Sequence, residues 1–414
     1  MSVQVALQQI FGPLIGTVIQ IFLFAAFVIV PLLLMLWFWK SWVKYVRALF
    51  FSSQKYVLLE LKIPKGIAKS PLAMELFMTT LHVTGGEGTP FDRYWLGKTR
   101  PWFSLEMVSI EGSVRFFIWT RDSFRSLVES QLYGQFPDLE ITAVPDYASA
   151  IPFSWDKYNL WGCDYKKSQP SHMPIKTYLS YGLDKDPEEE VKIDPITAVI
   201  EFMGSIGRGE QIWFQIGVRA HKKELIKPGT WFEKVDWTDA AKADIEKLMK
   251  RDKKKDDVLN IAEFSLTKGE RERVEAVEKN LAKIPFDIGM RAIYIAKTDV
   301  FKGTMAPGLS GMLRQYNAMN LNGFSPTNTT SFDYPWQDFT GHRLMKKKEI
   351  LLYLYRNRSF FYPEFFPDTY EFNHFVMTTE ELATIYHFPG DVSRTPNLGR
   401  ISAKRAEAPS NLPI

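Results

Sequence analysis

Residues 11–47 read FGPLIGTVIQIFLFAAFVIVPLLLMLWFWKSWVKYVR, and this stretch decides where the rest of the chain lies. No side chain from residue 3 to residue 39 is charged. Because a helix rises about 1.5 Å per residue and the hydrocarbon core of a bilayer is about 30 Å thick, about 20 apolar residues span it. We place the core of one tilted or kinked span at residues 19–39, where Gln20 is polar and Pro31 is tolerated.

The charge pattern after this stretch predicts its orientation. A cleavable signal peptide carries its positive charge before the apolar core, whereas here three basic residues follow it. The positive-inside rule therefore predicts a short N-terminus outside and the remaining chain in the cytoplasm. A buried helix of a soluble domain is the alternative, but such helices rarely stay uncharged for so long. The predicted membrane interface combines aromatic and basic residues: Trp37, Trp39, Lys40, Trp42, Lys44, Tyr45 and Arg47.

The composition of the remaining chain indicates ordinary packed domains. The sequence is 46% hydrophobic and 24% charged, which allows packed cores. Its single cysteine, Cys163, excludes an internal disulfide framework and suits a reducing compartment. The net charge is +4, from 51 basic and 47 acidic residues, so no overall basic field favours nucleic acid.

Residues 53–160 have the pattern of a first α+β unit. Apolar alternation predicts strands, a 3.6-residue period predicts helices, and Asp122 is the expected cap of the second helix. The order is βαββαβ, the ferredoxin-like arrangement. The expected strands are 56–63, 103–107, 114–118 and 139–144, and the expected helices are 71–83 and 122–132.

Part of this order recurs in residues 161–390, which we assign to a second ferredoxin-like unit. We expect strands at 175–183, 211–219, 287–297 and 350–356 and helices at 195–206 and 274–284, with a charged insertion at about 238–257. A long aromatic loop follows at about 319–348, and Thr378 with Glu381 makes a capping box. Residues 1–52 are the membrane anchor with its juxtamembrane helix, and residues 391–414 read as an extended tail.

No motif for catalysis, cofactor binding or metal binding stands out. The glycine spacing of a phosphate-binding loop occurs at 204–209 and 303–308, but Glu210 and Leu309 stand where its lysine is required. The six histidines form no i, i+4 pair, and no G-x-S-x-G elbow is present. We therefore expect no enzyme activity, no cofactor and no metal; an undetected hydrolase would need a catalytic cluster assembled by folding.

Two kinds of segment leave alternatives open. The basic runs at 250–255 and 346–348 read as solvated faces, and the alternative is a membrane-tethered nucleic-acid-binding module. The aromatic run at 360–367 reads either as a lid over a sheet or as a docking surface for another protein. Its candidate contact residues are Phe360, Phe361, Phe365 and Phe366.

Two stretches carry a resemblance to a known family. Residues 210–216, EQIWFQI, preceded by a helix, resemble the repeated domain of membrane-anchored proteins of bacterial conjugation and type IV secretion systems, especially in candidate-phyla bacteria. Residues 379–389, TEELATIYHFP, with 408–413, APSNLP, resemble the segment that precedes the P-loop ATPase domain of those proteins. Glu381, Leu382 and Tyr386 in this stretch are further candidates for a partner interface.

The resemblance covers residues 56–413, and the sequence ends at Ile414 without a Walker motif. It implies a single-pass protein of the bacterial inner membrane that acts as a scaffold for a separately encoded P-loop ATPase or other secretion-system proteins. The expected partners are thus the lipid bilayer and this ATPase. The sequence leaves open whether the chain forms a homo-oligomer.

Overall fold

The computed structural model describes residues 3–64, 69–151, 153–184, 193–226, 234–248, 266–362, 370–390 and 398–401. The side chains of residues 3–21, 23, 225, 226, 248, 400 and 401 are not part of this description. The basic run at 250–255, Phe365, Phe366 and most of the predicted tail lie outside the described residues. The chain divides into two compact units: unit 1 is Met1–Gln54 with Gly86–Thr99, and unit 2 is Lys55–Gly85 with Arg100–Ile414.

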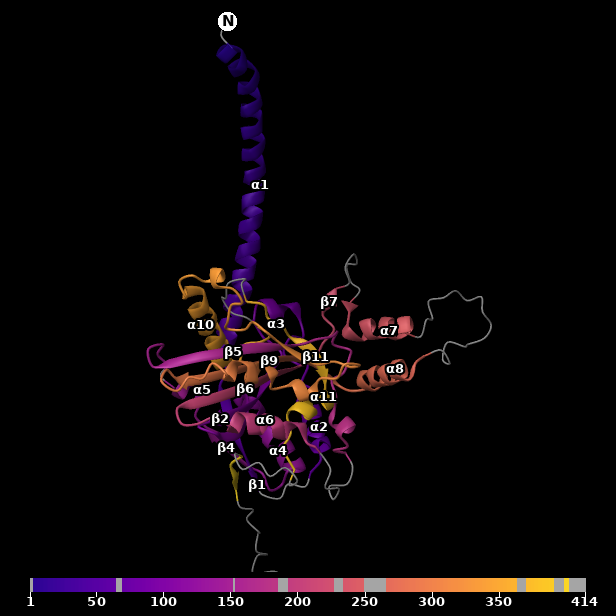
Figure 1. The fold of residues 1–414 in the computed structure, drawn as a ribbon. Coiled ribbons are helices and arrows are strands. Elements are labelled where there is room, and N and C mark those ends of the chain that lie inside the picture. The colour runs from indigo at the N-terminus through magenta and orange to yellow at the C-terminus, as the bar shows by residue number, and fades with distance from the viewer. Residues whose placement is uncertain are drawn as a thin grey trace, which may run out of the picture. The chain divides into compact units, whose positions relative to one another are not determined.

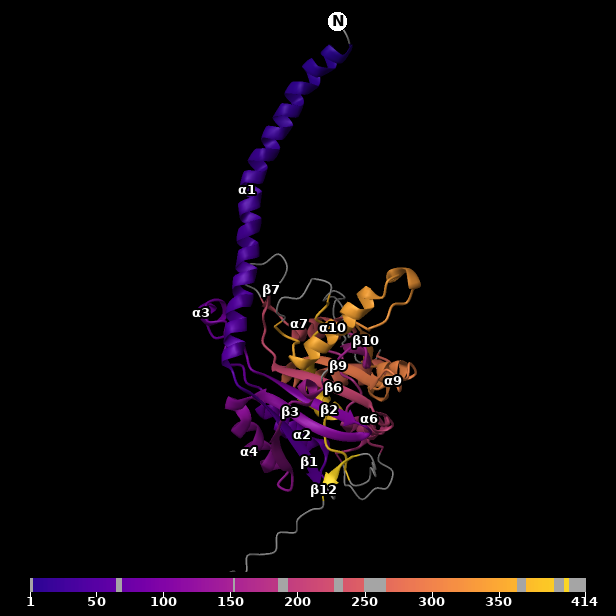
Figure 2. The same cartoon turned by 90° about the vertical axis from the view of Figure 1, so that its left-hand side faces the viewer.

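Unit 1 consists of one long helix and a short segment packed against it. Helix α1 is Val3–Ser53 and the short helix α3 is Pro90–Tyr94. Figure 2 shows α1 as one continuous, curved helix, which passes through Pro31 without a break. Its part Phe24–Ser53 is long and apolar enough to cross a membrane. The sequence prediction of a long apolar helix at the N-terminus is therefore confirmed.

Unit 2 is built on a large, mainly antiparallel sheet (Figure 1). Among the described residues ten strands join it, in the order β10-β5-β9-β6-β2-β3-β1-β12, with β4 also paired to β1 and β11 to β9. Only the β1–β12 pair among these strands is parallel. The strands are β1 Tyr56–Pro64, β2 Trp102–Ile110, β3 Ser113–Arg121, β4 Glu140–Val144, β5 Tyr158–Lys167, β6 Glu210–Ala220, β9 Pro285–Lys297, β10 Phe324–Thr327, β11 Phe375–Thr378 and β12 Arg400–Ile401.

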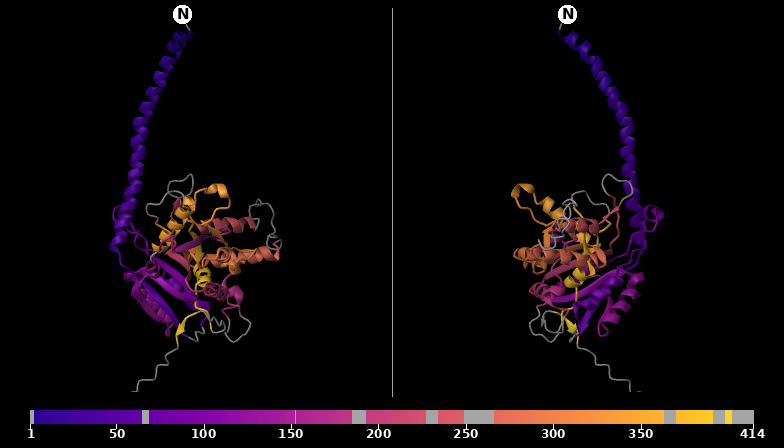
Figure 3. Two further views of the ribbon diagram at one scale, coloured as in Figure 1. Left: turned by 60° about the vertical axis from the view of Figure 1, so that its left-hand side comes forward. Right: turned by 90° about the vertical axis from the view of Figure 1, so that its right-hand side faces the viewer.

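Helices pack on both faces of this twisted sheet (Figure 3). One face carries the apolar core, to which Phe103, Leu105 and Phe214 contribute from the strands. The helices whose buried residues join this core are α2 Pro71–Thr80, α4 Arg125–Gln135, α6 Pro195–Gly204, α9 Met305–Gly311 and α11 Thr379–Ile385. The opposite face is covered by α5 Tyr147–Ala150 and α10 His342–Arg356.

A smaller group of elements lies between β6 and β9 in the chain. It contains the two-stranded sheet of β7 Leu225–Ile226 and β8 Lys234–Val235, and the helices α7 Trp237–Leu248 and α8 Lys268–Leu281. The two helices pack on each other through Ala241 and Val277, which are buried. This group includes the described part of the predicted charged insertion.

Two predicted strands are wrong. Residues 175–183 form a turn of 3-10 helix at Tyr178–Tyr181, because their backbone donors bond to side chains of α11. The amide of Ile175 donates to Glu381 at 3.0 Å and that of Tyr178 to Thr384 at 2.9 Å. Residues 350–356 belong to α10, since a short, mostly apolar run does not distinguish a strand from a buried helix face.

Further details differ from the sequence expectations. Strand β5 was missed, although its residues Leu160, Cys163 and Tyr165 are buried in the sheet. Asp122 does not cap α4; it begins a 3-10 turn, Asp122–Phe124, and α4 starts at Arg125. The capping box of Thr378 and Glu381 is confirmed at the start of α11.

Candidate functional site

The predicted membrane-interface residues lie along α1, where its apolar stretch ends. Trp37 and Tyr45 are exposed, whereas the aromatic rings of Trp39 and Trp42 contact the segment Gly86–Thr99. The ring centroid of Trp39 is 5.6 Å from that of Tyr94 and 5.7 Å from that of Trp95. Lys40, Lys44 and Arg47 follow on the same helix; Lys40 is exposed, and Lys44 and Arg47 are partly buried. Sequence reasoning missed Tyr94 and Trp95; their signal was a pair of interface-type aromatics next to the turn residue Gly97.

The second candidate region is a row of polar side chains on the sheet face opposite the apolar core. Cross-strand neighbours Glu106, Gln215, Arg291 and Asp164 continue one register row over β2, β6, β9 and β5. All four are buried. Since successive residues of a strand point to opposite faces, these side chains lie away from the core residues that alternate with them. A charged row buried in a sheet must be paired, and its partners show what it does.

Glu106 is the acceptor at one end of this row. Its carboxylate receives hydrogen bonds from Tyr147 at 2.7 Å, from Gln215 at 3.0 Å and from the Arg358 guanidinium at 3.0 Å. Arg358 also bonds Asp146, and the charges of Glu106 and Asp146 hold the pKa of Arg358 well above its usual value although burial alone would lower it. The network ties α5 and the end of α10 to the sheet.

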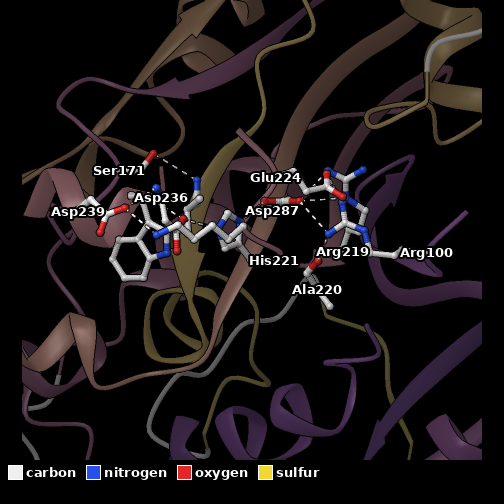
Figure 4. A network of polar contacts seen from close by, with 12 residues as sticks. Arg100, Ser171, Arg219, Ala220, His221, Glu224, Asp236, Asp239 and Asp287 are labelled. Atoms are coloured by element: carbon white, nitrogen blue, oxygen red, sulfur yellow. Dashed lines mark hydrogen bonds and ion pairs between the residues drawn. The ribbon is translucent and has the colours of Figure 1, made fainter. Parts of the chain in front are cut away.

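At the edge of the same face a second network centres on Asp287 and His221 (Figure 4). Asp287 accepts hydrogen bonds from Arg219 at 2.6 Å and pairs with His221 at 2.6 Å. The other imidazole nitrogen of His221 lies 2.7 Å from Asp236. Arg100 donates to the carbonyl of Ala220 and to Glu224, each at 2.8 Å. The guanidinium groups of Arg100 and Arg219 and the imidazole of His221 thus face three carboxylates, those of Asp287, Asp236 and Glu224.

This charge arrangement shifts the pKa values of both central groups. Burial alone would lower the pKa of His221, but the hydrogen bonds and charges of Asp287 and Asp236 outweigh it, and the pKa is raised. Burial would raise the pKa of Asp287, but His221 and Arg219 lower it. Both imidazole nitrogens are engaged by carboxylates, so neither is open to take a proton from a substrate. His221, which follows β6, therefore links β9 to the segment before α7 by its two hydrogen bonds.

Metal binding finds no support in the part of the chain that the structure describes. Within those residues no group of three or more His, Cys, Asp or Glu side chains is arranged to hold an ion. The thiol of Cys163 is buried, and burial raises its pKa, which makes it a poor ligand and a poor nucleophile.

The aromatic run at 360–367 covers this polar face with its described part. Phe360 is 6% exposed and lies on Gly217 and Gly289; a Cβ added to either glycine would come within 2.4 Å or 2.3 Å of its ring. The Arg291 guanidinium lies 4.4 Å from the Phe360 ring centroid, and the Arg219 guanidinium lies 4.5 Å from that of Phe361. These contacts support the interpretation as a lid over the sheet.

The other predicted partner residues lie in the interior. Glu381, Leu382 and Tyr386 are fully buried. Glu381 pairs with Lys167 at 2.8 Å, and the Tyr386 hydroxyl donates to the carbonyl of Phe117 at 3.0 Å. The side chains that were expected to face a partner therefore join α11 to the sheet, because nearly every residue of this helix is buried.

Three exposed aromatic side chains of unit 2 lie together on residues 332–345, which we call the aromatic loop. Tyr334, Trp336 and Phe339 are 52%, 62% and 86% exposed, and Met345 is 39% exposed. The rings of Tyr334 and Trp336 stack with centroids 4.5 Å apart. Sequence reasoning marked a long aromatic loop at about 319–348 but did not select these residues. The available signal was that acidic and amide residues separate the aromatics, so no period buries them together.

Internal hydrogen bonds give this aromatic loop a defined shape. The side-chain carbonyl of Gln337 accepts from the amides of Asp333 and Tyr334 at 3.1 and 3.3 Å. Asp338 accepts from the amide of Leu344 at 2.7 Å, which ties the loop to the start of α10. An ordered, exposed aromatic surface of this kind is typical of a protein interface.

The basic run at 346–348 lies in α10, and two of its three lysines contact other groups of the protein. Lys347 lies 4.2 Å from the ring centroid of Phe332, and Lys348 donates to the Asn159 side chain at 2.7 Å. Burial lowers the pKa of both lysines. Lys346 is exposed. One exposed lysine is a weak basis for binding phosphates.

Comparison with known proteins identifies the family. The family model for a domain of unknown function, DUF8128, matches residues 64–400. The chain therefore belongs to the DUF8128 family. No curated protein matches it. The match spans strands of the large sheet together with α10 and α11.

Proposed function

We propose that this DUF8128 protein is a single-pass membrane anchor and docking protein, which holds a separate P-loop ATPase of a conjugation or type IV secretion-like machine at the bacterial inner membrane. One observation carries the anchoring half: α1 offers an exposed apolar stretch of spanning length, followed by Lys40, Lys44 and Arg47 among aromatics. The order of charges supports a cytoplasmic position for unit 2.

The docking half is supported by how the polar groups of unit 2 are used. The charged side chains on this face of the sheet form ion pairs with one another, and the Phe360 ring covers part of the face. What the unit offers to a partner is the aromatic loop with Trp336 and Phe339. Large aromatic side chains dominate the binding energy of protein interfaces, so we assign the ATPase contact to this loop. That the partner is a P-loop ATPase rests on the resemblance of residues 210–216 and 379–389.

We further propose that unit 2 contains two ferredoxin-like halves. The strand order β4-β1-β3-β2 with α2 and α4 supports the first half, because it is the order expected of a βαββαβ unit. The order β10-β5-β9-β6 supports the second, with α6 and α9 in the helix positions and α7 and α8 inserted. The two halves then join through the β2–β6 pair.

Co-purification from native membranes in mild detergent tests the docking role. The full chain is expected to retain a protein that carries a Walker motif, identified by mass spectrometry. Replacing Trp336 and Phe339 by serine is expected to abolish this association. The control variant replaces Leu72 and Leu76 by serine; these are exposed apolar residues of α2, 47% and 48% exposed. This variant is expected to keep the association with the ATPase. If the wild type retains no such ATPase, or if both variants behave alike, the docking proposal is wrong.

A further inference from the structure

The segment Gly86–Thr99, which we call the clamp, lies directly on the backbone of α1. Gly97 has φ +60°, and a Cβ on it would stand 2.2 Å from the carbonyl oxygen of Val46. Only glycine permits this approach. Val46 is 5% exposed and is the buried residue of the described part of α1. The lower end of the clamp is thus fixed to the helix by close backbone contact.

The other end of the clamp is fixed by tryptophans of α1. The indole N–H of Trp42 donates to the carbonyl of Tyr94 at 3.0 Å, and Trp39 packs on the rings of Tyr94 and Trp95. Trp39, Trp42 and Val46 are spaced i, i+3 and i+7, which places them on one face of the helix. At about 1.5 Å per residue the clamp covers about 10 Å of α1.

Its own hydrogen bonds keep the clamp in one shape. Thr89 and Asp92 form a capping box at the start of α3, with the Asp92 amide 3.1 Å from the Thr89 hydroxyl. Asp92 also pairs with Lys98 at 2.9 Å, and Arg93 pairs with Glu87 at 3.1 Å. These polar groups of the clamp therefore satisfy one another.

The outer side of the clamp is apolar and exposed. Phe91, Trp95 and Leu96 are 59%, 53% and 43% exposed. The rings of Phe91 and Trp95 stack with centroids 6.4 Å apart and an interplanar angle of 12°. These three large apolar side chains form a patch on and just after the five-residue helix α3. Its exposure to water costs a free energy of about 25 cal/mol per Å² of apolar surface.

We propose that the clamp is a second membrane contact of this chain, inserted into the headgroup layer beside α1 with Phe91, Trp95 and Leu96 directed to the acyl boundary. This inference rests on the proposed membrane anchoring by α1. The clamp begins level with Trp39, the last residue of the predicted span core, and extends along the cations Lys40 and Lys44. Tryptophan and tyrosine favour this layer, and the cations favour its anionic lipids.

The physical consequence is that α1 is held at more than one point. A single helix can rotate and slide in a bilayer, and interfacial aromatic anchors set its tilt and rotation. With the clamp on one face of α1, only one rotation directs Phe91, Trp95 and Leu96 into lipid. The clamp therefore fixes the rotation of α1 about its own axis.

Depth-dependent fluorescence quenching of the full chain tests this inference. The buried Cys163, whose pKa is raised by burial, stays unreactive, so a maleimide dye labels only an introduced cysteine. The reporter is Leu96→Cys, with Phe91→Cys as a second position. Val28→Cys on α1 reports the span, and Met319→Cys, at a fully exposed residue of unit 2, reports water. The chain is reconstituted in vesicles of phosphatidylethanolamine and phosphatidylglycerol.

Nitroxide lipids labelled near the top of the acyl chain are expected to quench most of the fluorescence at residues 96 and 91 and to leave residue 319 bright. Quenching at residue 28 without quenching at 96 and 91 would overturn the clamp proposal while the anchoring stands. Loss of quenching at residue 28 as well would overturn the anchoring itself. An aqueous quencher that reaches 96 as readily as 319 would also contradict the proposal.

Discussion

Phe360 and Phe91 stand in two aromatic segments that look alike in sequence, yet they have opposite surroundings. Phe360 is 6% exposed and fits between Gly217, Gly289 and the Arg291 guanidinium. Phe91 is 59% exposed and contacts the ring of Trp95, which is 53% exposed. The two phenylalanines differ because Phe360 packs on Gly217 and Gly289, which lie in strands distant from it in sequence. Aromatic richness alone therefore indicates neither a lid nor a membrane contact; the residues underneath decide.

The largest expected effect comes from breaking the charged row under the lid. Arg358→Met leaves the fully buried Glu106 carboxylate without its cation, and we expect the free energy of unfolding to fall by about 3–5 kcal/mol. The measurement is urea unfolding of the full chain in detergent, followed by near-UV circular dichroism.

Arg115→Met is the matched control for that variant. Arg115 pairs with Glu60 at 3.5 Å and is 49% exposed, so its loss is expected to cost at most about 1 kcal/mol. Equal losses for the two variants would mean that the buried row contributes no more than a surface pair.

Substitutions of Gly217 and Gly289 under Phe360 are expected to have the next largest effect on stability. Gly217→Ala or Gly289→Ala would press a methyl group against the Phe360 ring, and we expect a loss of about 1–3 kcal/mol in the same unfolding experiment. Gly134→Ala, in α4, meets no atom within 4 Å and is expected to stabilise by about 0.5–1 kcal/mol. If all three substitutions had the same sign, Phe360 would not be packed on these glycines.

In the clamp, Gly97→Ala is expected to act locally. The left-handed backbone costs an L-residue about 1–2 kcal/mol, and the added methyl group collides with the Val46 carbonyl. A dye on Leu96→Cys in this background should lose its lipid quenching, while a dye on Val28→Cys keeps it. Retained quenching at residue 96 would show that contact with α1 does not position the clamp.

The smallest effect is a pH dependence through His221. Its pKa is raised by folding, so its contribution to stability is complete below the unfolded value of about 6.5 and is lost as pH rises through the folded value. The difference in unfolding free energy between wild type and His221→Gln is therefore expected to be larger at pH 6 than at pH 9. His374, whose pKa burial lowers, has the opposite dependence, which is why the difference is measured. A difference that grows with pH would contradict the charged state of His221.

The sequence predicted much of the fold because many elements carry local signals. The alternation at 103–107 and 114–118, the helical period at 195–206 and the capping box of Thr378 with Glu381 all gave correct elements. The prediction for residues 175–183 failed because distant groups supply their hydrogen-bond partners, and that for residues 350–356 failed because a short apolar run is ambiguous. The backbone of residues 175–183 is satisfied by Glu381 and Thr384, more than 200 positions away.

The candidate sites show the same division. Trp39 and Trp42 could be selected from sequence because the charge step beside them marks an interface. Tyr94 and Trp95 could not be placed beside them without the contact of Gly97 with Val46. Glu381 and Tyr386 were selected from a resemblance, and the structure places both in the core.

Membrane topology tests the central claim most directly, that α1 anchors the DUF8128 unit on the cytoplasmic side. Met319→Cys and Gln4→Cys, expressed as full chains in bacteria, are treated with a membrane-impermeant maleimide before and after permeabilisation of the inner membrane. We expect residue 4 to be labelled in intact spheroplasts and residue 319 only after permeabilisation. Labelling of residue 319 in intact spheroplasts, or release of the chain by alkaline carbonate, would contradict the account.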